Sequence, residues 1–125
     1  MKLSVIKMSI FVYEPDLIFS SKFEGIAHLI EQDFRIFTDL TTLLKDARSE
    51  KPVAFIINLD ATKPEGVQNV LTFGVPVMGY YSHVNAEAAQ SAANLGVSPI
   101  VTRGVFVANA ESFIRKLLDS RRPGF

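Results

Sequence analysis

The spacing of apolar residues in this chain alternates between short continuous runs and stripes that recur every three or four positions. The continuous runs are rich in Val, Ile and Phe, as is typical of β-strands that are covered on both faces. They are Ser9–Glu14, Phe34–Thr38, Val53–Leu59, Val75–Tyr81 and Ser98–Thr102. The stripes have the period of a helix that rests on a sheet, as Phe23, Ile26 and Ile30 illustrate. This alternation of βα units predicts a parallel sheet with right-handed crossovers.

Polar residues mark the starts of the predicted helices, because their side chains accept hydrogen bonds from free backbone N–H groups. The candidate N-caps are Ser20 or Ser21, Asp39, Asn85 and Asn109. The 125 residues fit one domain. We therefore expect residues 1–125 to form a flavodoxin-like, three-layer αβα sandwich with a five-stranded parallel sheet of order 2-1-3-4-5. Residues 119–125 are expected to form an irregular, disordered tail.

The composition excludes several classes of protein. No cysteine is present, which excludes disulfide scaffolds, thiolate zinc sites and cysteine nucleophiles. The 13 Lys and Arg residues balance the 13 Asp and Glu residues, which argues against a broad nucleic-acid surface. No apolar stretch reaches the length of a membrane helix, about 18 residues. Lys7 interrupts the apolar start of the chain, which argues against a signal peptide. We expect a cytoplasmic protein that binds neither nucleic acid nor membranes.

Polar side chains stand at the ends of several predicted strands. Glu14 and Asp16 follow the first strand, and Asp60 follows the third. These strands are neighbours in the predicted order, so the acidic groups meet at the carboxyl edge of the sheet, where open α/β sheets bind ligands. Converging carboxylates suit Mg²⁺, which prefers oxygen ligands. Glu14, Asp16 and Asp60 are therefore candidate metal ligands, and Ser82 and Arg103 would flank a phosphoryl group on Asp60.

The same residues have plainer structural interpretations. Asp60 is also typical of a residue that hydrogen-bonds the following turn. Glu14 and Asp16 are acids that the dipole of the first helix would favour. Arg103 would form a charge-assisted pair with Asp60 that holds this edge of the sheet closed without any phosphate.

The chain resembles the receiver domains of two-component response regulators, the CheY-like superfamily, over nearly its whole length. Asp60, followed four positions later by Pro64, is similar to the phosphoacceptor segment of that family. Val75–Met78 resembles its fourth strand, and Leu95–Ser98 resembles the turn before its fifth. In that family an acidic pair at the end of the first strand binds Mg²⁺, and Glu14 matches one member of the pair.

The chain also departs from the family pattern. Arg103-Gly104 stands where the family has Lys-Pro, and Tyr13 stands where the second carboxylate belongs. Ile100 replaces the aromatic switch residue, and either Tyr81 or Ser82 takes the place of the strand-four hydroxyl. A planar Arg fork is not equivalent to the compact Lys ammonium. These departures indicate a divergent receiver, or pseudo-receiver, with degenerate phosphoacceptor chemistry.

The resemblance implies a stand-alone, non-enzymatic signalling module that acts through protein–protein interaction. Its expected partner is a histidine kinase or a downstream target. A homodimer through the fourth helix, fifth strand and fifth helix is a further expectation. Apolar residues that exceed the needs of the last strand would supply that surface; they are Ile100, Val105, Phe106 and Val107.

Two alternative functions follow from the same residues. One is a working receiver in which Asp60 is phosphorylated with the help of Mg²⁺. The other is a small ligand-binding protein or enzyme that uses the crevice at the strand ends. That second alternative predicts an open pocket bordered by Asp60, Tyr81, Ser82 and Arg103.

Overall fold

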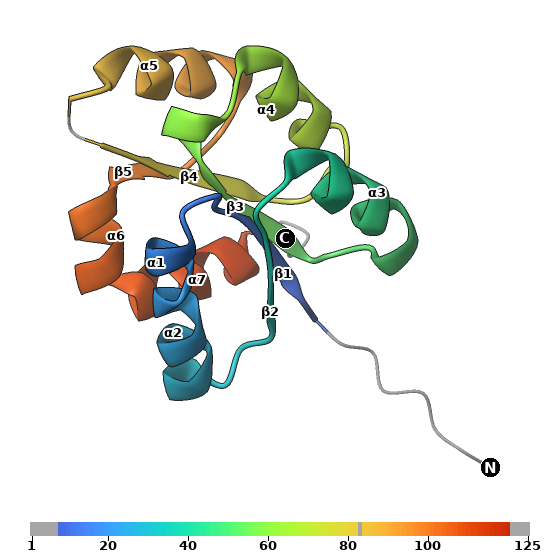
Figure 1. Cartoon of the computed structure of the whole chain (residues 1–125), viewed down its shortest axis with the longest axis vertical. Helices are drawn as coiled ribbons and strands as arrows, with labels where there is room; N and C mark the ends of the chain where they lie inside the picture. The colour runs from blue at the N-terminus through green and yellow to red at the C-terminus, as the bar shows by residue number, and fades with distance from the viewer. Residues whose placement is uncertain (1–7, 83, 121–125) are drawn as a thin grey trace.

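The computed structural model describes residues 8–82 and 84–120 and confirms the predicted fold class and strand order (Figure 1). The strands are β1 (Ile10–Tyr13), β2 (Phe34–Phe37), β3 (Ala54–Asn58), β4 (Val77–Tyr81) and β5 (Ile100–Thr102). Every neighbouring pair is parallel, and the order across the sheet is β2-β1-β3-β4-β5. Because β1 and β3 are neighbours, their carboxyl ends lie side by side at one edge of the sheet.

Helices cover both faces of the sheet and complete the three layers (Figure 1). One face carries α1 (Leu17–Ser20), α2 (Lys22–Ile30), α6 (Arg103–Ala108) and α7 (Ala110–Asp119). The other face carries α3 (Leu40–Glu50), α4 (Pro64–Leu71) and α5 (Ala86–Leu95). A 3-10 turn, η1 (Leu59–Ala61), lies between β3 and α4.

Side chains of β3 alternate between the two halves of the core. Ala54 and Ile56 pack against the layer of α1, α2, α6 and α7, whereas Phe55 and Ile57 pack against the layer of α3, α4 and α5. All four side chains are fully buried, which explains why this strand has a continuous apolar sequence. Burial of each of the three larger side chains contributes about 1.5–3 kcal/mol. The central strand therefore anchors both layers.

The observed helix starts confirm some of the predicted caps and correct others. The side chains of Asp39 and Asn85 cap α3 and α5, as predicted. A short helix that the sequence analysis did not predict, α1, precedes the first predicted helix, because Asp16 accepts hydrogen bonds from two backbone N–H groups. Ser21 and Asn109 stand at the starts of α2 and α7 but make no side-chain cap bond there.

The apolar segment that follows β5 is only in part the exposed surface that the sequence predicts. It forms α6, and the side chain of Phe106 is fully buried. The Phe106 ring stacks on Tyr80, with ring centroids 5.4 Å apart, and lies 5.6 Å from the ring of Phe23. Val105 and Val107 are 45% and 38% exposed. Only the two valines of this segment therefore offer apolar surface to a partner.

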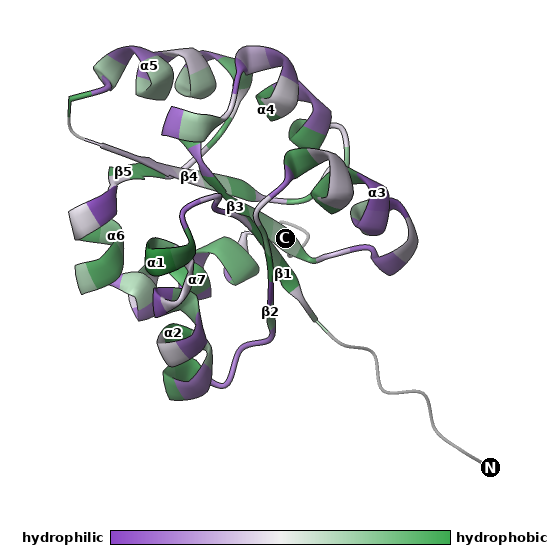
Figure 2. Cartoon of the chain, viewed as in Figure 1, coloured by the Kyte–Doolittle hydropathy of each residue, from purple (hydrophilic) through white to green (hydrophobic). Residues whose placement is uncertain are grey.

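The last described helix, α7, packs Ile114 and Leu117 into the core. α7 extends through Asp119, and residues 121–125 of the predicted tail lie outside the described residues. Within the described ranges, no helix is both long and apolar enough to cross a bilayer. Figure 2 shows α1 as hydrophobic, although Leu17 and Ile18 are 72% and 83% exposed. This short helix therefore presents apolar side chains at the surface beside the carboxyl edge.

Gly79 in the middle of β4 makes room for the turn that carries Asp60. A Cβ atom added at Gly79 would lie 2.7 Å from Cδ1 and 2.8 Å from Cγ of Leu59. Leu59 is the first residue of η1 and is 2% exposed, so its side chain has no free space into which to move. The absence of a side chain at position 79 therefore fixes η1 against the sheet.

We expect Gly79→Ala to lower the free energy of unfolding by about 1–3 kcal/mol, because the added methyl overpacks this contact. The matched control is Gly25→Ala in α2, where an added Cβ meets nothing within 4 Å. The control should be neutral or up to about 1 kcal/mol stabilising, because Ala favours helices. Urea unfolding measures both values, and equal stabilities for the two variants would contradict the packing argument.

Candidate functional site

A fully buried carboxylate, Glu14, lies at the centre of the carboxyl edge. The Nδ2 group of Asn58 donates to both of its oxygens at 3.0 Å. The hydroxyl of Tyr80 donates to Oε1 at 2.6 Å, and the backbone N–H of Asp16 donates to Oε2 at 3.0 Å. Each carboxylate oxygen thus has at least two hydrogen-bond donors before any cation is counted, as a buried charge requires.

The strand register brings these side chains together. Tyr13 pairs with Ile57 across β1 and β3, which places the next residues, Glu14 and Asn58, side by side. Asn58 in turn pairs with Tyr80 on β4. Because side chains alternate along a strand, the residue two positions after a core residue of one face points to that same face. Glu14, Asn58 and Tyr80 therefore all point toward the layer of α1, α2, α6 and α7.

Arg103 supplies the positive charge of this network. It is the first residue of α6, which starts there because the Thr102 hydroxyl accepts a hydrogen bond from a backbone N–H of the first turn. Its Nη2 atom lies 3.5 Å from Oε1 of Glu14, and its guanidinium lies 4.2 Å from the centre of the Phe19 ring in α1. The Arg103 side chain is 36% exposed, so solvent weakens this ion pair relative to a fully buried one.

The hydroxyl of Tyr80 is a permanent donor in this network. Burial of the ring, followed by the hydrogen bond to the Glu14 carboxylate, raises the pKa of Tyr80 far above its ordinary value. The rings of Phe19 and Phe106 lie 5.4 Å from that of Tyr80 and exclude water from it. The Tyr80 hydroxyl therefore stays protonated near neutral pH.

In the described structure, the side chain of Asp60 forms no hydrogen bond with the Glu14 carboxylate and has other partners. It belongs to η1, two residues beyond the end of β3, and its side chain is exposed. One carboxylate oxygen accepts from the backbone N–H of Ser82 at 2.8 Å, and the other accepts from Nδ2 of Asn85 at 2.9 Å. Its own N–H donates to Oδ1 of Asn58 at 2.9 Å. Asp60 thus ties the turn after β3 to the connection between β4 and α5.

The three predicted metal ligands are not gathered into one site. Glu14 is enclosed by donors, Asp16 accepts from the first backbone N–H groups of α1, and Asp60 faces the connection after β4. Within the described ranges, no group of three acidic, His or Cys side chains could hold a metal ion. Amide and hydroxyl donors around Glu14 would meet a cation with their positive ends, so these residues do not fit Mg²⁺.

The residue that faces Glu14 from β3 is Asn58, which the sequence interpretation did not select. Its amide orientation is fixed on both sides, because Oδ1 accepts from Asp60 while Nδ2 donates to Glu14. A carboxylate at position 58 would place its oxygen against an oxygen of the Glu14 carboxylate, and the two negative charges would repel each other. A buried asparagine that ends an otherwise apolar strand was the available sequence signal for this position.

A crevice of about 320 Å³ opens beside the network. The ligand-binding alternative predicts four lining residues, and all four are present: Asp60, Tyr81, Ser82 and Arg103. Thr102 and Gly104 complete the lining. Ser82 offers its backbone N–H rather than its hydroxyl to Asp60. Arg103 forms its ion pair with Glu14 and not with Asp60. The crevice is near the lower limit of ligand pockets, which span about 300–1,000 Å³.

Comparison with known proteins identifies the fold. Neither the family models nor the curated proteins compared with this chain give a match. Among solved structures, a CheY-like receiver domain from Methanospirillum hungatei is similar, with a TM-score of 0.80 at 12% identity over 92% of this chain and 96% of that one. A response regulator from Thermotoga maritima is similar at 0.78 and 8% identity, over 90% and 98% of the two chains.

A third similar structure is the receiver domain of a putative LuxO repressor protein from Vibrio parahaemolyticus, with a TM-score of 0.78 and 11% identity over 92% of both chains. These structures confirm at the level of the fold the resemblance that the sequence indicates. At such low identities the likeness concerns the path of the backbone, and the chemistry must be argued from the residues of this chain.

We expect the Tyr80 network to lose stability in alkali. The folded state raises the pKa of Tyr80 above its ordinary 10.0, so the folded protein holds this proton more tightly than the unfolded chain. This contribution is complete below pH 10 and falls by about 1.4 kcal/mol per pH unit above it. Urea unfolding from pH 8 to pH 11 measures the decline.

Tyr80→Phe should be less stable near neutral pH by about 1.5–3 kcal/mol, because a hydrogen bond to a charged group is lost, and it should lack this alkaline decline. Tyr81→Phe is the matched control, since the Tyr81 hydroxyl makes no hydrogen bond to the described residues and its ring is half-buried. An alkaline decline of the same size in Tyr80→Phe and in the unsubstituted chain would contradict the assignment.

Proposed function

We propose that this chain, which has the fold of a receiver domain, works as a signalling module that acts through protein–protein contact with degenerate phosphoacceptor chemistry. The observation that carries the proposal is the closed network around Glu14. Its carboxylate is already satisfied by Asn58, Tyr80 and Arg103. A receiver of this composition would hold one conformation through its own side chains, without metal or phosphate.

The position of Asp60 supports the same proposal. Phosphoryl transfer to a carboxylate relies on cations that neutralise the transferred group. Asp60 has the N–H of Ser82 and the amide of Asn85 as partners, and these neutral donors supply no positive charge. The cation in the crevice, Arg103, is engaged by Glu14. A phosphoryl group on Asp60 would therefore compete with the buried carboxylate for that cation.

The network also lies next to surfaces that suit a protein partner. Arg103 connects the start of α6 to Glu14 and to the Phe19 ring of α1. Those two helices carry exposed apolar side chains, namely Leu17, Ile18, Val105 and Val107. Exposed aliphatic groups gathered on adjacent helices are typical of docking surfaces. A downstream protein is the proposed partner, and self-association through α5, β5 and the α6–α7 segment remains the prediction for a dimer.

Incubation of the full chain with acetyl phosphate and Mg²⁺ is expected to leave its mass unchanged, because the described residues around Asp60 supply neither a metal site nor a free cation. Intact-mass spectrometry measures the result. Asp60→Asn and Glu65→Gln serve as matched carboxylate controls, since both side chains are exposed.

Gain of one phosphoryl group that is lost in Asp60→Asn and retained in Glu65→Gln would contradict the proposal. That outcome would instead support the alternative of a working receiver, with a histidine kinase as its partner. A mass gain that persists in both variants would indicate modification elsewhere and would leave Asp60 outside the chemistry.

A second candidate function is the binding of a small molecule, which the crevice itself favours. Asp60 and Arg103 offer a negative and a positive group on the walls of about 320 Å³. A zwitterion such as a free amino acid has the complementary ammonium and carboxylate at a short spacing. The volume is in the range of small ligands.

Thermal unfolding in the presence of each of the standard amino acids tests this second function. A ligand of the folded state raises the midpoint temperature in a concentration-dependent way, and Asp60→Asn should abolish the rise while Glu65→Gln retains it. Unchanged midpoint temperatures with every amino acid would contradict small-molecule binding in the crevice. That result would not affect the signalling proposal.

A further inference from the structure

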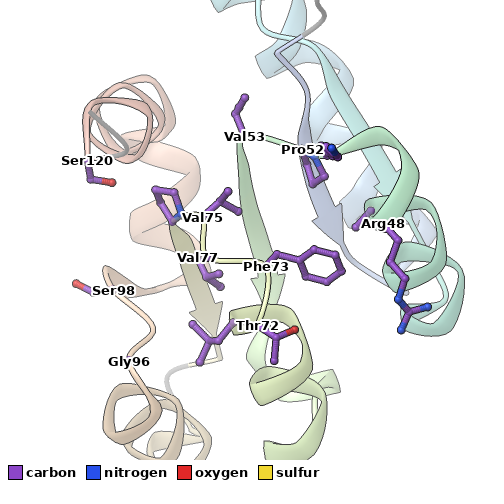
Figure 3. Close-up of a pocket in the computed structure, with 15 residues that line it drawn as sticks. Arg48, Pro52, Val53, Thr72, Phe73, Val75, Val77, Gly96, Ser98 and Ser120 are labelled. Atoms are coloured by element: carbon purple, nitrogen blue, oxygen red, sulfur yellow. The ribbon is translucent and has the colours of Figure 1, made fainter. Parts of the chain in front are cut away.

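A cavity lies at the opposite edge of the sheet, at the amino ends of the strands (Figure 3). It has a volume of about 1040 Å³ and is bordered by the segments that lead into β3 and β4. The ends of α3, α4, α5 and α7 also contribute, through Lys51, Thr72, Gly96 and Ser120. A cavity of this size is at the upper end of the range for small-molecule sites, about 300–1,000 Å³.

The middle of the cavity is apolar. Figure 3 shows the ring of Phe73 pointing from the α4–β4 connection toward the end of α3, where Pro52 lies. Phe73 stays half-buried although its ring is only 5.4 Å from that of buried Phe55. Val53 and Val75 are likewise half-buried and line the same space. This apolar surface would gain from contact with a hydrophobic group, at about 25 cal/mol per Å² of area removed from water.

One side of the cavity carries two positive charges that form no ion pair within residues 8–82 and 84–120. Arg48 and Lys51 line it, both side chains are exposed, and neither forms an ion pair with any described residue. The acids of the same helix, Asp46 and Glu50, are both engaged by Arg35 from the edge strand β2. The acids of α3 are thus directed away from the cavity, and its α3 side keeps a local excess of positive charge.

The partial charges of the helix ends oppose this excess only weakly. Several helices end at the cavity, and a helix C-terminus carries roughly half a negative charge on its free carbonyl groups. Those carbonyls are partly satisfied, because the N–H groups of Lys51, Thr72 and Gly96 donate back to the last turns of α3, α4 and α5. The full charges of two side chains therefore dominate the field on the α3 side.

From these observations we propose that the amino-edge cavity binds an organic anion with an apolar body. The acidic group would lie against Arg48 and Lys51, and the apolar body would rest on Phe73 and the two valines. The hydroxyls of Ser98 and Ser120, which Figure 3 shows on the side away from Arg48, would meet a polar far end. The class includes aryl and acyl carboxylates, sulfonates and phosphate esters. This site is separate from the crevice at the carboxyl edge.

Anilinonaphthalene sulfonate, a fluorescent aryl anion, is the probe for the first test. The double variant Arg48→Glu and Lys51→Glu should bind it at least about tenfold more weakly, a difference of ~1.4 kcal/mol. Lys51 has a φ of 51°, and Glu there imposes the same backbone strain as Lys. The double variant Lys22→Glu and Lys63→Glu is the control, because it changes the net charge equally at residues outside the cavity.

A second variant reduces the free volume of the cavity without changing its charge. Thr72→Trp would place a ring in the cavity from the end of α4 and should weaken binding of the probe while both cations remain. Circular dichroism and urea unfolding establish that each variant is folded. Equal affinity in the unsubstituted chain and the Arg48/Lys51 variant, or equal loss in the Lys22/Lys63 control, would overturn the proposal.

Amide NMR shifts locate the bound probe. Shifts confined to residues 47–53, 71–77 and 96–98 support the cavity. Shifts centred on residues 58–60, 81–82 and 102–104 would place the anion in the crevice beside Arg103 and would overturn the proposal. Absence of any shift at a probe concentration that saturates the fluorescence would show only non-specific adsorption, and would overturn it as well.

Discussion

Burial of a single carboxylate, Glu14, constrains the whole carboxyl edge of this sheet. An ionised group taken out of water without partners costs several kcal/mol, so its donors have to be supplied by the fold. They come from the end of β3, from β4 and from the start of α6, through Asn58, Tyr80 and Arg103. Each donor fixes the position of its own element relative to β1. One buried charge therefore contacts side chains from two further strands and a helix.

This arrangement changes what a receiver fold can do. In the family that the chain resembles, acidic groups at this edge gather a metal ion and a phosphoryl group. Here the corresponding charge is neutralised from within, and Asp60 stabilises a turn. Under the proposed function, a module of this kind responds to what docks on its surface or enters its cavities. Its two edges offer different chemistry, a zwitterionic crevice at one and a cationic, apolar cavity at the other.

The sequence was sufficient to predict the topology, because strands buried on both faces and amphipathic helices have different periods. It was insufficient at the site. The spacing of Asp60 and Pro64 matches the family motif, but it does not specify where the strand ends, and η1 occupies the three positions that follow Asn58. The apolar residues after β5 fit a strand or a helix equally well. The helix forms because Thr102 caps it and Phe106 packs on Tyr80, contacts that join residues distant in the chain.

The position of Arg103 has a consequence for how the protein opens. β5 is three residues long and pairs with β4 alone, so it is the kind of segment that normally frays first. Arg103 follows it directly and is the cation that faces the buried anion. Partial detachment of β5 would therefore move Arg103 away and leave the buried Glu14 carboxylate without its cation, which is energetically unfavourable. The ion pair therefore links the edge of the sheet to its buried centre.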